Sequence, residues 1–94
     1  MITRLVDKLL EDCFAQAEQV EAESLLIAEC SNGLPMVDSD LELIERIQVG
    51  VIKLSRGDLI LLRKWIAQAN EDWRDVLDSA GFYRDPKAHL SWKP

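Results

Sequence analysis

The sequence contains few residues that interrupt helices, crosslink chains or bind metals. Among its 94 residues there are four glycines, three prolines, two cysteines and one histidine. The glycines are isolated from one another, so there is no glycine-rich loop that could cradle a phosphate. The cysteines and the histidine do not have the spacing of a zinc site. We therefore predict no cofactor and no metal, and we assign no catalytic residue.

Long apolar runs are also missing. No segment approaches the roughly eighteen consecutive apolar residues that a membrane-spanning helix needs. Asp7, Glu11 and Asp12 interrupt the apolar residues near the N-terminus, which is unlike the apolar core of a signal peptide. We expect Cys13 and Cys30 to be free thiols, which is typical of a reducing compartment. These features predict a soluble, cytoplasmic protein that does not bind membranes.

Basic residues are scarce in the first third of the chain. Residues 1–30 hold seven acidic and two basic residues, a balance of −5 within the net charge of −6. An acidic surface repels phosphate backbones and anionic lipids. The charge therefore argues against nucleic acid and membrane surfaces as partners.

The sequence does contain strong helical periodicity. Apolar residues make up 48% of the chain and recur at steps of three and four, the spacing of one face of an α-helix. No strand-like alternation competes with this pattern. We predict one all-α domain over residues 1–94, a three-helix bundle-like fold with one long N-terminal helix and a short C-terminal helical turn or tail.

The first predicted helix runs from about Thr3 to Cys30. No glycine or proline interrupts it, and Gly33 and Pro35 follow as stop signals. A continuous helix would hold its two cysteines roughly 25 Å apart, beyond the reach of a disulfide. Its apolar stripe consists of Val6, Leu10, Cys13, Ala17, Val20, Ser24 and Ile27.

The second predicted helix covers residues 40–54. Ser39 and Glu42 have the spacing of a capping box, in which each side chain accepts a hydrogen bond from a backbone amide of the first turn. Gly50 lies inside this helix, where it either allows another helix to approach closely or weakens the last turn.

The third predicted helix carries its apolar stripe from Leu59 to Ala80. Ser55 is the expected N-cap, with Asp58 at the third helical position. At the other end Gly81 is expected to adopt the left-handed conformation that closes a helix, followed by Phe82. Trp73 lies on the stripe and is expected in the core. Trp65 lies beside the stripe, where it packs under the tail or forms a contact surface.

Four acidic residues allow an enzymatic interpretation. Glu42 and Glu45 share one predicted helix, and Asp72 and Asp75 share the next. This pattern resembles the all-helical nucleoside-triphosphate pyrophosphohydrolases, which bind magnesium with Glu-x-x-Glu and Glu-x-x-Asp pairs. The chain departs from the family at Asp72, where the family has glutamate, and no basic groups for a triphosphate are evident. The resemblance implies a metal-dependent nucleotide hydrolase. The other interpretation of these residues is a solvated helix face.

A helix-turn-helix nucleic-acid binder is the second alternative. The predicted turn near Ser55 is tight, and Arg56, Arg63 and Lys64 lie near the start of the third helix. The acidic net charge opposes this interpretation.

We favour a third class, a small non-catalytic module that binds another protein or a second copy of itself. A short second helix would leave residues 2–14 of a long first helix uncovered, and a large apolar face is rarely left in water. A homodimer related by a two-fold axis would cover it. The residues predicted to bind the partner are Leu5, Leu9, Leu10, Phe14 and Trp65.

Overall fold

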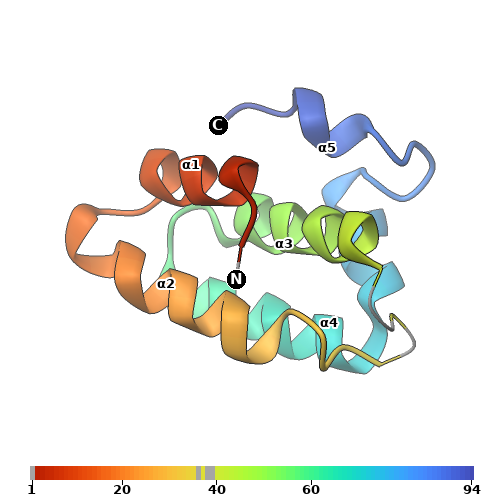
Figure 1. The fold of residues 1–94 in the computed structure, drawn as a ribbon, viewed down its shortest axis with the longest axis horizontal. Helices are drawn as coiled ribbons and strands as arrows, with labels where there is room; N and C mark the ends of the chain where they lie inside the picture. Colours follow the sequence, from red (N-terminus) through yellow and green to blue (C-terminus); the bar gives the residue numbers. More distant parts are fainter. Residues whose placement is uncertain (1, 36, 38–39) are drawn as a thin grey trace.

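The computed structural model describes residues 2–35, 37 and 40–94. This part of the chain forms five helices and no strand, in agreement with the all-α prediction (Figure 1). None of the helices in these residues is both long enough and apolar enough to cross a membrane. The helices are α1 (Arg4–Cys13), α2 (Gln16–Glu29), α3 (Leu41–Ser55), α4 (Leu59–Ala80) and α5 (Ala88–Ser91).

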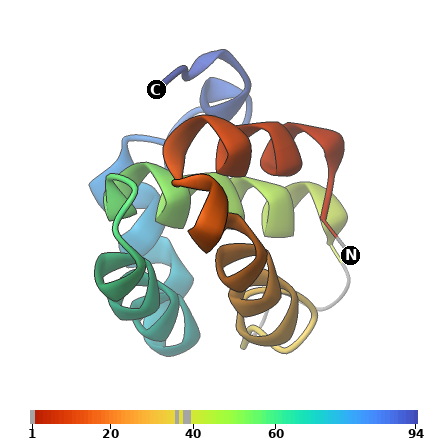
Figure 2. The same ribbon diagram turned by 90° about the vertical axis from the view of Figure 1, so that its left-hand side faces the viewer.

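The helices are arranged as two pairs around a central contact. α3 and α4 form the most extensive helix–helix contact; α1 packs on α3, and α2 packs on α4. Figure 2 shows α1 above α3 and α2 beside α4, with the C-terminal segment beyond α1 and α3. α5 contacts α3. The helix-bundle prediction is therefore confirmed in outline.

The prediction of one long N-terminal helix is wrong, because the helix is interrupted between α1 and α2. Phe14 and Ala15 both have ψ of 145°, which is extended rather than helical backbone. A straight helix over residues 3–30 would be roughly 42 Å long, whereas the longest dimension of the fold is 32 Å. The break lets α2 turn back along α4, and α4 is the longest helix instead.

Local contacts hold this break in place. The side chain of Phe14 is buried in the core, so the chain cannot shift without emptying that site. The Nε2 atom of Gln19 donates a hydrogen bond to the Phe14 carbonyl at 3.1 Å. A buried aromatic ring and a side-chain hydrogen bond thus stabilise an interruption of the helix that glycine or proline produces in other connections.

α3 begins at Leu41, with Asp40 as its N-cap. The Asp40 carboxylate accepts a hydrogen bond from the Leu43 amide at 3.1 Å. The capping role predicted for Ser39 lies outside the described residues. Gly50 of α3 faces α4, since a Cβ there would lie 3.2 Å from Val76 Cγ1. Of the two roles expected for Gly50, the close helix approach is therefore confirmed.

The N-cap of α4 is Asp58, so the prediction of Ser55 at that position is wrong. Ser55 is the last residue of α3, and its hydroxyl donates to the Ile52 carbonyl at 2.7 Å. Arg56 and Gly57 then take positive φ values of 53° and 76°, which separates the two helices. The Asp58 carboxylate accepts from the Ile60 and Leu61 amides.

The predicted C-terminus of α4 is confirmed. Gly81 has φ of 82°, the Phe82 amide donates to the Leu77 carbonyl at 2.8 Å, and the Gly81 amide donates to the Asp78 carbonyl. These two bonds are the Schellman pattern. Lys53 of α3 supports this end, because its ammonium group donates to the Ala80 carbonyl at 2.7 Å.

α4 contains a kink at Asp72 that the apolar periodicity of the sequence does not predict. Asp72 has φ of −156° and ψ of 97°, outside the helical region. Its carboxylate accepts hydrogen bonds from the amide and the side chain of Arg74, both at 3.1 Å. Asp72 therefore acts as a second N-cap within α4. Gln68 bridges the kink by donating to the Asp75 carboxylate.

Candidate interaction surface

The outward side of α2 carries an apolar stripe. Val20 and Ile27 are 72% and 42% exposed, although both are large aliphatic residues. Ala22 and Leu26, on the opposite side of the same helix, are completely buried. We call the stripe formed by the following exposed residues the α2 face: Ala17, Val20, Ser24 and Ile27.

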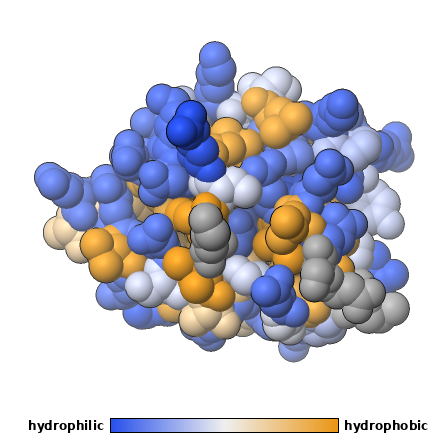
Figure 3. All heavy atoms as spheres, in the orientation of Figure 1, coloured by the Kyte–Doolittle hydropathy of each residue, from blue (hydrophilic) through white to orange (hydrophobic). Residues whose placement is uncertain are grey.

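Figure 3 shows the side of the molecule on which α2 lies in front, where apolar patches alternate with charged side chains. The four residues follow steps of three, four and three, which places them in one line over about three turns. The small side chains of Ala17 and Ser24 alternate with the larger Val20 and Ile27. Side chains with this spacing form the contact line between helices in helix pairs.

The charges next to the α2 face are acidic. α2 contains four glutamates and no basic residue. Glu21 follows Val20 and Glu23 precedes Ser24, so one carboxylate lies on each side of the stripe. Arg63 of α4 forms an ion pair with Glu21, and both side chains remain about half exposed. Glu21 therefore still presents carboxylate oxygen to solvent.

The surface predicted from the sequence lies mostly inside the molecule. Leu9, Leu10 and Phe14 are only 2–4% exposed, and they belong to the main apolar core. Leu5 and Trp65 are partly buried and pack against that core. The premise that residues 2–14 are uncovered is therefore wrong, because α1 packs directly on α3.

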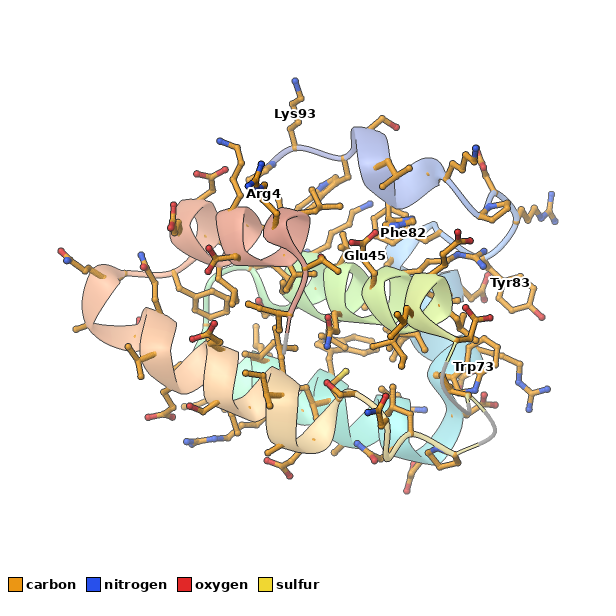
Figure 4. The ribbon with its side chains drawn as sticks, in the orientation of Figure 1. Arg4, Glu45, Trp73, Phe82, Tyr83 and Lys93 are labelled. Atoms are coloured by element: carbon orange, nitrogen blue, oxygen red, sulfur yellow. The ribbon has the colours of Figure 1, made fainter. Side chains whose placement is uncertain are left out.

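The C-terminal segment also covers part of α1. Trp92 is partly buried and lines a groove together with Leu5 and Leu9. The partial burial of Leu5 thus comes from within the chain, and a second copy is not required for it. Figure 4 shows Arg4 and Lys93 at the outer edge of this region.

The four acidic residues of the enzymatic interpretation do not form one site. Asp72 is engaged by Arg74, whose hydrogen bonds hold the pKa of the Asp72 carboxyl below its ordinary value. Asp75 accepts from Gln68, and Glu45 faces His89. Glu42 lines a shallow hollow that also includes Trp73. Within the described residues, no group of three or more acidic, histidine or cysteine side chains is placed to hold a metal ion.

His89 is a buried polar residue that fastens α5 to the rest of the fold. Its Nε2 atom lies 3.3 Å from a carboxylate oxygen of Glu45 on α3. Its ring packs edge-on against Phe82, with ring centroids 6.3 Å apart. In Figure 4 Glu45 and Phe82 lie in the space between α3 and α5. The geometry assigns Glu45 and His89 a structural contact between two helices.

The aromatic and cysteine side chains fill structural positions. Trp73 is at the edge of the core beside the first turns of α3, and is only partly buried (Figure 4). Cys30 is completely buried, and burial raises the pKa of its thiol to about 12. Cys13 is partly exposed, and burial followed by the neighbouring Asp12 raises the pKa of its thiol. Neither thiol has the lowered pKa of a nucleophile.

The basic residues of the nucleic-acid interpretation do not act as one group. Arg56 occupies the left-handed position between α3 and α4, and Arg63 pairs with Glu21. Lys64 is exposed on α4. With Arg63 paired to an acidic helix, the local positive charge is small.

No family model, no curated protein and no solved structure matches this chain.

Proposed function

We propose that this protein is a non-catalytic helical module that binds another protein through the α2 face. The observation that carries the proposal is the exposure of Val20 and Ile27 on the side of α2 opposite the core. Leaving a large aliphatic side chain in water forgoes about 1.5–3 kcal/mol relative to burying it. Single exposed aliphatic residues are common on proteins. Two in line on one helix, with the small residue Ser24 between them, match the spacing of helix–helix contacts.

A further exposed apolar residue lies on α4, the helix that contacts α2. Ile60 is 76% exposed, and it lies one turn before Arg63, the residue that pairs with Glu21 of α2. Ile60 is thus an exposed apolar side chain on the helix against which α2 packs. The homodimer predicted from the sequence was assigned to residues of α1 rather than to the α2 face, and it stays a prediction.

Photo-crosslinking in cells that express the protein tests the proposal. A photoreactive residue at position 20 should give a discrete adduct, and the same residue at position 42, on α3, should not. Ile27→Asp should remove the adduct without changing the circular dichroism spectrum, because Ile27 is exposed. Equal crosslinking from positions 20 and 42, or an adduct unaffected by Ile27→Asp, would contradict the proposal.

A further inference from the structure

The chemistry around the α2 face also distinguishes between possible partners. The line Ala17, Val20, Ser24, Ile27 has the spacing of alternating core positions in a coiled-coil heptad. In that register Glu21 and Glu23 occupy the two positions that border the core. The buried Ala22 falls on the position directly opposite it. The register and the observed burial therefore agree.

A second copy of the same helix is a poor match for this face. In either a parallel or an antiparallel pair, the bordering positions of one helix meet those of the other. α2 contains four glutamates and no basic residue, so a second copy of this helix supplies no cation to place against Glu21 or Glu23. Residues 1–30 as a whole carry a net charge of −5, so the N-terminal segments of two copies would repel each other.

Taking the proposed function as its basis, we infer that the α2 face binds an amphipathic helix of another protein whose apolar stripe is bordered by lysine or arginine. Such a helix would place cations against Glu21 and Glu23 and would fill the spaces above Ala17 and Ser24. Glu21 can accept a further cation because its ion pair with Arg63 leaves both side chains about half exposed. Opposite charges on the bordering positions select partners in helix pairs.

Two synthetic helical peptides test this inference with the full chain. Both have leucine and alanine at the core positions; one has lysine and the other glutamate at the bordering positions. Fluorescence anisotropy at about 50 mM salt should show at least tenfold tighter binding of the lysine peptide. The preference should shrink at about 500 mM salt, because exposed charges are then screened.

Charge variants identify where the preference comes from. The double variant Glu21→Gln with Glu23→Gln should lose most of the preference for the lysine peptide. The matched control, Glu42→Gln with Asp78→Asn, removes two charges from α3 and α4 and should keep it. Equal binding of the two peptides, binding of neither, or loss of the preference in the control would overturn the inference.

Two further outcomes separate this inference from the proposed function. Binding of the lysine peptide that is unchanged in Val20→Asp would place the contact elsewhere and overturn both. Light scattering that shows a dimer at tens of micromolar, abolished by Val20→Asp, would identify a second copy as the occupant. That result would support the α2 face as a binding surface and overturn the basic partner.

Discussion

Two glycines with left-handed backbone allow two costs of an alanine substitution to be separated: the cost of holding a residue with a Cβ at positive φ, and the cost of a steric clash of that Cβ. Gly57 and Gly81 have nearly the same φ, 76° and 82°. A Cβ at Gly81 would have ordinary contact, with Lys53 Nζ 3.9 Å away, whereas a Cβ at Gly57 would lie 2.4 Å from the carbonyl oxygen of Cys13. Alanine at either site therefore has the same conformational cost, but only Gly57→Ala also forces the turn away from the end of α1.

The expected magnitudes follow from these contacts. Holding an alanine in the left-handed region costs about 1 kcal/mol, so Gly81→Ala should lower Tm by about 4–8 °C in a domain of this size. Overpacking against backbone adds about 1–3 kcal/mol, which brings Gly57→Ala to about 2–4 kcal/mol. The effect of alanine on the unfolded chain is common to both variants and cancels in the comparison.

Urea unfolding followed by tryptophan fluorescence measures both variants. Asparagine gives a second comparison, because it tolerates positive φ but still carries a Cβ. Gly81→Asn should be more stable than Gly81→Ala, whereas Gly57→Asn should be nearly as unstable as Gly57→Ala. If Gly57→Ala were no less stable than Gly81→Ala, the α3–α4 turn would not pack on the end of α1.

Three other perturbations test the polar contacts within the fold. Gln48→Leu removes the buried donor that bonds the Cys30 carbonyl at 2.9 Å, so the free energy of unfolding should fall by about 1–3 kcal/mol; an unchanged urea midpoint would contradict this. The pKa of the Cys30 thiol is raised in the fold from 9.0 to about 12. Its contribution to stability is therefore fully present below pH 9 and is lost as the pH rises toward 12. In unfolding curves across this range, the Cys30→Ala variant should lack this part of the pH-dependent loss of unfolding free energy. The pKa of Asp72 is lowered, so its contribution is present above its ordinary value of 3.8 and lost as the pH falls below that value; Asp72→Ala should lower Tm more than Asp72→Asn, since asparagine also caps helices.

Local signals made the end of α4 predictable. Gly81 is a residue that adopts the left-handed conformation at little cost, and Phe82 follows it as an apolar residue that can return to the core. Both signals act within one turn and do not depend on distant parts of the chain. The apolar stripe of α4 was predictable for the same reason, and its members Leu62, Ile66 and Ala69 are buried.

Competition between capping residues was not predictable from the same signals. Ser55, Asp58 and Asp72 all have side chains that can accept from a nearby amide. Asp58 was selected because Arg56 and Gly57 form the turn that lets α4 pack on α3. Asp72 bends α4 part-way along, and periodicity alone contains no mark of that bend.

The break after α1 explains both the error in the predicted surface and the origin of the α2 face. The stripe that begins with Val6 and Leu10 continues in the sequence through Val20 and Ile27 with no change of rhythm. Two extended residues at the break change the direction of the helix and the side that each half presents. The first half of the stripe consequently lies in the core, and the second half faces solvent.

Burial of α2 uses a different set of residues, Ala22 and Leu26, which lie off the predicted stripe. The helix therefore has two apolar sides, of which packing on α4 requires only one. A helix held in the fold by one side, with a second side of coiled-coil spacing left in solvent, has an apolar face that its own fold does not use. Packing within the chain therefore does not explain the exposed half of the stripe, and the proposed binding to a partner helix would cover it.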